Sequence, residues 1–260
     1  MTLERRSLGE DAWVLVSRSL EDAGFLGAFT ERTGGRSAAP FASLNLSYSS
    51  GDAPDVVADN RRRVAEALGT PPWTLGGQVH GAHLVRVGKT RAGSGWDGPD
   101  GVIPDTDGLF TATRGIPVAV ATADCVPVLL ADPTSGVVAA IHAGWRGAAA
   151  GILDRALEIF ADPSTVLAAI GPAAKACCYE VGPDVALAVA AGTAGGAVTR
   201  EADGKLFLDL PASLAATLQL AGVEQVEDAG LCTIHEPDRF FSHRRDGAPG
   251  GRQFAVAMRR

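Results

Sequence analysis

Short runs of apolar residues, separated by polar turns, recur along the chain and predict more strands than helices. We expect a strand wherever turn residues bound such a run. The expected strands are Ala12–Ser17, Phe25–Thr30, Pro117–Thr122, Val126–Ala131, Val137–Ile141, Val166–Ile170, Leu206–Leu210 and Phe254–Met258. Because these runs cluster instead of alternating with helices, the pattern favours an α+β domain over regular βαβ units.

Apolar residues spaced three and four apart predict helices between these strands. The expected helices are Val56–Leu68, Ala148–Ala161 and Pro211–Ala221. Within the first helix, we interpret the Arg61–Arg63 run as its solvated face. The segment Glu31–Asp52, rich in Gly, Ser and Ala, predicts a long loop. Loops of that length inside a compact domain are often functional.

Composition narrows the class of protein. The 260 residues are enough for one large domain over 1–260, and the net charge of −7 comes without a basic run, so we expect no nucleic-acid partner. No apolar stretch is long enough for a bilayer, and no apolar h-region opens the chain. We therefore expect a cytoplasmic protein without a membrane partner, and four cysteines in the reduced state.

A candidate metal site follows from the segment Cys125–His142. Its two apolar runs flank Asp132-Pro133-Thr134-Ser135-Gly136, which predicts a hairpin centred on Thr134. In that register Cys125 and His142 lie within one residue of direct opposition, where Cβ atoms are about 5 Å apart. A thiolate beside an imidazole suits zinc.

His80 is the best third ligand, because the glycines of Gly76-Gly77-Gln78-Val79-His80-Gly81 allow close backbone approach. Three protein ligands leave one open position, as in catalytic zinc sites. Other interpretations stay open from the residues alone. In one interpretation, Cys125 is a small buried hydrophobic residue and His142 is a hydrogen-bonded core residue. In another, the two side chains form a nucleophilic Cys–His pair without metal.

Charged residues near this segment are further candidates. Arg146, at the start of the helix after His142, would clamp an anion beside free backbone N–H groups, or lie on the surface over Trp145. Asp124 and Asp107 would orient a ligand histidine or move a proton, although Asp107 also fits a turn. The simplest interpretation of Cys177 and Cys178 is that both side chains are buried and pack in the core.

Ordered motifs through nearly the whole chain resemble the YfiH-type family, also called laccase-domain or polyphenol-oxidase-type proteins. One departure is Gly250-Gly251-Arg252, where the family usually has Thr-Gly-Arg. The matching motifs are Thr30–Ser37, Ser43–Leu46, Gly51-Asp52, Asn60-Arg61, Gln78–Gly81, Asp107-Gly108, Thr122–Cys125, His142–Gly147, Gly171-Pro172, Cys178–Gly182 and Phe241–Asp246.

The resemblance implies an α/β/β/α fold, with two mixed β-sheets sandwiched between helical layers. It places the metal triad on His80, Cys125 and His142. It implies a zinc-dependent purine nucleoside phosphorylase, acting on adenosine, inosine, guanosine and methylthioadenosine, with adenosine deaminase activity. The partners are then a small nucleoside and phosphate. Besides the triad, we expect Asp124 and Arg146 to be catalytic residues. The candidate substrate-binding residues are Arg32, Asn45, Arg146 and Arg244.

Two other activities ascribed to such proteins are alternatives. One is editing of peptidoglycan precursors as an amidase, and the other is copper-dependent polyphenol oxidation. Only five histidines are present, so a four-copper oxidase cannot be built and copper would have to occupy the zinc site. Deamination would have to proceed without the H-x-E and C-x-x-C signature of nucleobase deaminases, which this chain lacks. A purely structural zinc domain is disfavoured, since such sites have four protein ligands.

Overall fold

The computed structural model describes residues 3–9 and 11–260 and shows two six-stranded sheets packed face to face. Residues 1, 2 and 10, part of the segment in which no signal peptide is expected, lie outside the described residues. The first sheet has the order β1 (Glu4–Gly9), β2 (Ala12–Val16), β3 (Phe25–Thr30), β15 (Gln253–Arg259), β7 (Val118–Thr122), β4 (Thr74–Leu75). The second has the order β14 (Gln225–Asp228), β10 (Leu167–Ile170), β8 (Val126–Asp132), β9 (Val137–Ala143), β6 (Gly108–Thr111), β5 (Leu84–Arg86).

Both sheets are mixed, because β4 pairs in parallel with β7, β10 with β14, and β5 with β6. A small third sheet has the order β11 (Glu180–Val181), β13 (Lys205–Leu208), β12 (Thr199–Ala202). The α-helices are α1 (Arg18–Asp22), α2 (Pro54–Leu68), α3 (Trp145–Ala149), α4 (Ile152–Leu157), α5 (Pro183–Gly192), α6 (Leu210–Leu220) and α7 (His243–Asp246).

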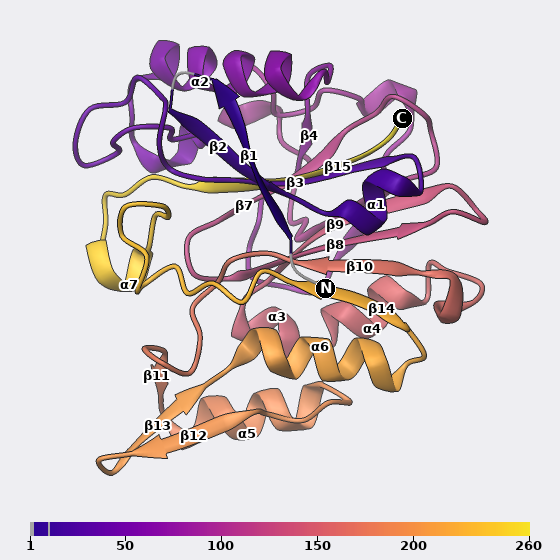
Figure 1. Ribbon diagram of the computed structural model, residues 1–260, viewed down its shortest axis with the longest axis vertical. Coiled ribbons are helices and arrows are strands. Elements are labelled where there is room, and N and C mark those ends of the chain that lie inside the picture. The colour runs from indigo at the N-terminus through magenta and orange to yellow at the C-terminus, as the bar shows by residue number, and fades with distance from the viewer. Residues whose placement is uncertain (1–2, 10) are drawn as a thin grey trace.

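Helices cover both outer faces of the sheet pair, with α2 on the first sheet and α3, α4 and α6 on the second (Figure 1). The central strand β8 shows how the core is shared. Val128 and Leu130 pack toward the helices, whereas Leu129 packs between the sheets. A strand buried on both faces needs apolar residues at every position, which is why Val126–Ala131 reads as a continuous apolar run. The expected α/β/β/α architecture is confirmed.

Several expected boundaries agree closely with the structure, and two helical regions do not. Strand Phe25–Thr30 is confirmed, and α2 begins two residues before the expected helix, at Pro54. The prediction of a single helix over Ala148–Ala161 is wrong. The chain forms α3 and α4 instead, because Gly151 takes a left-handed φ of 74° between them. The expected strand Leu206–Leu210 stops at Leu208.

Helix α5 was missed by the patterning, since the Ala and Val residues of Pro183–Gly192 mark no single apolar stripe. The β8–β9 hairpin was expected, but its register is shifted by one residue. Its loop lies between Asp132 and Val137, so the centre falls after Thr134. Within the described residues, no helix is both long and apolar enough to cross a bilayer.

Candidate active site

A cavity of about 780 Å³ opens beside the ends of β7, β8 and β9, and the expected triad lines it. The ligand atoms of His80, Cys125 and His142 all lie within 4.8 Å of one another. The two imidazole rings meet edge to face, with centroids 4.9 Å apart. His142 is buried, Cys125 half-buried and His80 exposed, so the cluster faces the cavity from its wall.

The donor set of the triad fits zinc. One thiolate and two imidazoles are ligands that zinc prefers, and three protein ligands leave a coordination position toward the cavity. Cys125 directly precedes β8 and Gly144 directly follows β9. A Cβ atom on Gly144 would lie 3.0 Å from Cys125 Sγ and 3.0 Å from His80 Cδ2. Glycine at this position therefore lets the two ligand-bearing segments approach each other.

Asp107, fully buried, organises two of the three ligands. One carboxylate oxygen lies 2.8 Å from His142 Nδ1, which directs the Nε2 atom of that ring to the metal position. The same carboxylate accepts hydrogen bonds from the backbone N–H groups of Val79, His80 and Gly81. His80 has a left-handed φ of 61°, and these bonds hold that conformation. Of the roles considered for Asp107, the contact with His142 therefore favours orientation of that imidazole ring.

The charges of the triad are coupled. Burial raises the pKa of the Cys125 thiol, but hydrogen bonds from His142 and His80 outweigh it and bring that pKa to about 6. Burial lowers the pKa of His142, whereas hydrogen bonds to Asp107 and Cys125 outweigh it and raise that pKa to about 9. Near pH 7 the metal-free site is therefore a thiolate beside an imidazolium.

This protonation state predicts proton release when zinc binds. A ligand histidine must be neutral, so between pH 6 and pH 9 zinc should displace about one proton, the one on His142. Below pH 6 a second proton, from Cys125, should also leave, so zinc affinity should fall as pH drops. Calorimetry in buffers of different ionisation enthalpy measures the count. The number of protons released by the parent minus the number released by the Cys125→Ala variant gives the release at the triad. A difference of zero protons at pH 7.5 would contradict zinc binding by a protonated His142.

Replacing Asp107 by asparagine should weaken zinc binding by about 10- to 100-fold, as is typical for the outer partners of metal ligands. The amide keeps the shape but loses the negative charge that faces His142 and three N–H groups. Competition with a chromophoric chelator measures the affinity, and thermal unfolding of the zinc-saturated variant checks the fold. An unchanged zinc affinity in a folded Asp107→Asn protein would show that the carboxylate does not act on the ligands.

Asp124 lines the cavity but has both carboxylate oxygens engaged. One accepts from Thr233 Oγ1 at 2.6 Å and the other from the backbone N–H of Arg244 at 2.7 Å. It therefore fixes the loop that carries Arg244. The Arg244 guanidinium lies 5.3 Å from the centre of the Tyr179 ring, and both side chains line the cavity. The expectation that Arg244 contacts substrate stays a prediction.

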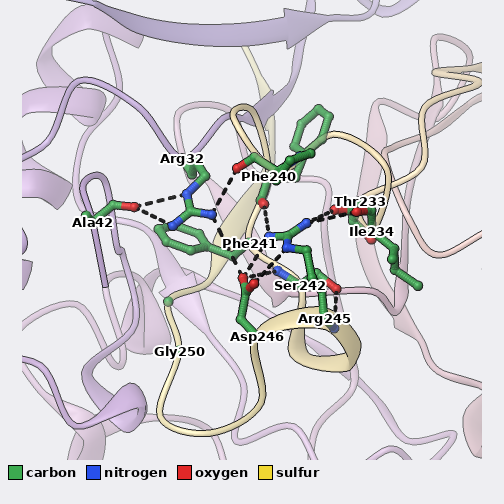
Figure 2. A network of polar contacts seen from close by, with 12 residues as sticks. Arg32, Ala42, Thr233, Ile234, Phe240, Phe241, Ser242, Arg245, Asp246 and Gly250 are labelled. Atoms are coloured by element: carbon green, nitrogen blue, oxygen red, sulfur yellow. Dashed lines mark hydrogen bonds and ion pairs between the residues drawn. The ribbon is translucent and has the colours of Figure 1, made fainter. Parts of the chain in front are cut away.

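Arg32 and Asn45, also expected to bind substrate, do not line the cavity. Arg32 donates to the carbonyl of Ala42 at 3.0 and 2.8 Å, and its guanidinium stacks on Phe241, as Figure 2 shows. Asn45 is buried, and its carboxamide oxygen accepts from the backbone N–H of Arg252. These polar contacts of both side chains are therefore with other parts of the protein, and the two residues lie outside the cavity lining.

Arg146 is exposed and lies outside the cavity lining, with its guanidinium 4.4 Å from the centre of the Trp145 ring. Helix α3 is only five residues long and turns Gly147 and Ala148 inward, which sends the Arg146 side chain to solvent. The structure thus favours the surface interpretation of this arginine over the anion clamp.

Two other arginines line the cavity and were not selected from the sequence. Arg61 was interpreted as solvated but is buried, because it follows Val57 by four residues and precedes Val64 by three on the inner face of α2. Its guanidinium donates to the carbonyls of Leu46, Gly95 and Trp96. The spacing of Arg61 from Val57 and Val64 could therefore have predicted its burial.

Arg252 comes from the segment where the chain departs from the family pattern. Its Nη1 donates to the carbonyls of Gly250 and Gly251. Burial lowers the pKa of Arg252, and the charges of Asp124 and Cys125 partly offset that effect. Arg252 therefore presents a positive charge to the same space as the triad. Gly251 is required there, since a Cβ would lie 2.5 Å from the Phe241 ring.

The chain is similar to known proteins along most of its length. A family model described as multi-copper polyphenol oxidoreductase laccase matches residues 27–260. A protein of Deinococcus radiodurans named purine nucleoside phosphorylase is 43% identical over 235 residues, covering 88% of this chain and 87% of that protein. Purine nucleoside phosphorylase ORF3 of Streptomyces griseus is 42% identical over 234 residues, covering 86% of this chain and 90% of that protein.

Solved structures give the same relationship. YlmD from Geobacillus stearothermophilus superposes with a TM-score of 0.91 at 35% identity, covering 99% of each chain. The Bacillus licheniformis protein YfiH superposes with a TM-score of 0.90 at 31% identity, covering 98% of this chain and 99% of that one. With a matching family model, relatives above 40% identity and an almost complete superposition, the chain belongs to the YfiH-type laccase-domain family.

Proposed function

We propose that this protein is a zinc-dependent purine nucleoside phosphorylase that also deaminates adenosine. One observation carries the proposal: the three-ligand triad and two arginines, Arg244 and Arg252, line the same cavity. Phosphorolysis needs a site for an anion beside the nucleoside, and guanidinium groups are well suited to bind phosphate. The names of the relatives from Deinococcus radiodurans and Streptomyces griseus support the same activity.

In the proposed mechanism, His80, Cys125 and His142 hold zinc, which supplies Lewis acidity at the cavity wall when bound. Asp107 fixes the His142 ring, so the ligand set is in place before substrate enters. Arg252 and Arg244 hold phosphate, and the rings of Tyr48 and Tyr179 offer apolar faces for the purine and ribose.

Direct attack of phosphate on the ribose needs no covalent enzyme intermediate. Phosphate oxygen forms a bond to the anomeric carbon of ribose, the bond from that carbon to the purine nitrogen breaks, and the purine takes up a proton. The protein then acts through positioning and charge stabilisation. Deamination uses water in place of phosphate: water oxygen forms a bond to carbon 6 of the purine, the bond to the amino group breaks, and ammonia leaves while the ribose stays attached. The two reactions therefore differ in their need for the arginines.

Product analysis with adenosine tests the proposal. The parent protein is incubated with adenosine with and without inorganic phosphate, and adenine, ribose 1-phosphate and inosine are measured separately. We expect adenine and ribose 1-phosphate only when phosphate is present, and inosine in both cases. Absence of phosphate-dependent adenine release would reject the phosphorylase and leave the cell-wall amidase as the leading alternative.

A further inference from the structure

A second group of metal-ligating side chains lies outside the cavity lining. It consists of Cys177, Cys178, Cys232 and His235, whose ligand atoms all lie within 4.8 Å of one another. All three cysteines are free thiols. In the described part of the chain, this cluster and the triad are the two groups of this kind. Cys177 is exposed, so the interpretation of Cys177-Cys178 as buried packing is wrong.

The backbone brings two distant segments together to form this cluster. Ala173 forms a parallel bridge with Cys232, and its carbonyl accepts from the backbone N–H of Thr233 at 3.1 Å. A turn closed by the bond from Glu236 N–H to the Cys232 carbonyl then places His235 on the same side as Cys232. On the other segment, a turn after Lys175 presents Cys177 and Cys178.

Four ligands of this kind match a closed tetrahedral site. Zinc–sulfur bonds of about 2.3 Å place two sulfur ligands about 3.8 Å apart, so atoms within 4.8 Å of one another need shifts of about 1 Å or less to close on one ion. Three thiolates and one imidazole are a common ligand set of structural zinc. Two ligands, Cys177 and His235, are exposed, which gives an ion a path from solvent.

We propose that Cys177, Cys178, Cys232 and His235 form a second, structural zinc site, distinct from the three-ligand triad. The four side chains fill the coordination sphere, so no position is open for substrate. Binding replaces the thiol protons with one dication and involves no oxidation. The inference does not depend on the activity proposed for the cavity.

The position of the cluster indicates what the ion would do. Cys178 directly precedes Tyr179, which lines the cavity, and Cys232 directly precedes Thr233, whose hydroxyl donates to Asp124. Arg245 holds the same segment by donating to the carbonyls of Thr233 and Ile234 (Figure 2). A metal here would join the segment that carries Tyr179 of the cavity lining to the segment whose Thr233 holds Asp124.

Zinc content of protein purified without added metal and passed over a chelating resin tests the site. The parent should hold about two zinc ions per chain, as expected for one three-ligand and one four-ligand site. Cys177→Ser/Cys178→Ser and His235→Ala should each hold about one, and so should Cys125→Ala. The combination Cys125→Ala/Cys177→Ser/Cys178→Ser should hold almost none. His83→Ala, an exposed histidine outside both groups, is the matched control and should keep two.

Cobalt substitution gives a second reading that does not depend on stoichiometry. The Cys125→Ala variant should keep strong thiolate-to-cobalt absorption, because three thiolates remain around the second ion, and Cys177→Ser/Cys178→Ser should lose most of that absorption. One zinc in the parent together with none in Cys125→Ala would overturn the proposal. So would a mass lower by two hydrogens in protein prepared without oxidant, since a disulfide would then occupy the cluster.

Discussion

Replacing Cys125 by alanine is expected to remove one zinc ion per chain and to lower turnover by about 10³-fold or more. Zinc supplies several kcal/mol of transition-state stabilisation, and each 1.4 kcal/mol is about a factor of ten in rate. Cys125 is the single thiolate of the triad, and His80 and His142 alone make a weak site. Zinc analysis and adenosine turnover of the purified variant measure both effects, with His83→Ala as the control that keeps both.

The same variant separates two roles of Cys125. A ligand that is removed takes its metal with it, whereas a nucleophile that is removed leaves the metal behind. A Cys125→Ala protein with unchanged zinc content but no turnover would favour the Cys–His nucleophile. His80→Ala and His142→Ala should behave like Cys125→Ala, because all three side chains converge on one point.

Arg252→Ala should lower phosphorolysis by about 10²-fold and reduce deamination much less. A charge-assisted contact to an anion is worth a few kcal/mol, and deamination needs water instead of phosphate. Arg252 faces the same space as Cys125 and Asp124, and its backbone is fixed by Asn45. Separate measurement of adenine and inosine formed from adenosine gives the two rates, and the phosphate dependence of the first gives the change in KM.

Arg146→Ala is the matched control, because Arg146 is exposed and stacks on Trp145 outside the cavity. It should change neither rate by more than a few-fold. Equal loss of phosphorolysis and deamination in Arg252→Ala would mean that this residue supports the loop or the nucleoside. A large loss in Arg146→Ala alone would move the phosphate site to the start of α3.

The description of the matching family as multi-copper oxidoreductases is not reflected in the donor groups of this chain. The described residues gather two metal-ligating groups, which together use three of the five histidines. A trinuclear copper cluster needs many more imidazoles than these. Copper in the triad would be mononuclear, so any oxidase activity would be that of a single substituted ion.

The triad could be predicted because its geometry is mostly local. Cys125 and His142 lie at the ends of one hairpin, and an error of one residue in the register did not separate them. The glycines around His80 marked the third segment. What the sequence did not show was why His80 is placed there, because Asp107 acts through its carboxylate on three backbone N–H groups from another loop.

The residues that surround the triad depended on tertiary contacts. Arg61 was missed because three consecutive arginines suggest a solvated face, although its spacing from Val57 and Val64 points inward. The position of Arg252 in the cavity lining depends on how Gly251 packs on Phe241. The second cluster depends on an isolated bridge between Ala173 and Cys232, which brings together two segments far apart in the sequence and which no local pattern predicts.

Transfer of labelled phosphate to ribose tests the central claim most directly. The parent protein, adenosine and ³²P-phosphate should yield labelled ribose 1-phosphate in a one-to-one ratio with adenine, and Cys125→Ala should yield almost none. Release of adenine without label in the sugar would mean hydrolysis of the glycosidic bond. Equal label transfer by the parent and by a Cys125→Ala protein that has lost one zinc ion per chain would contradict a phosphorylase that depends on the His80, Cys125 and His142 site.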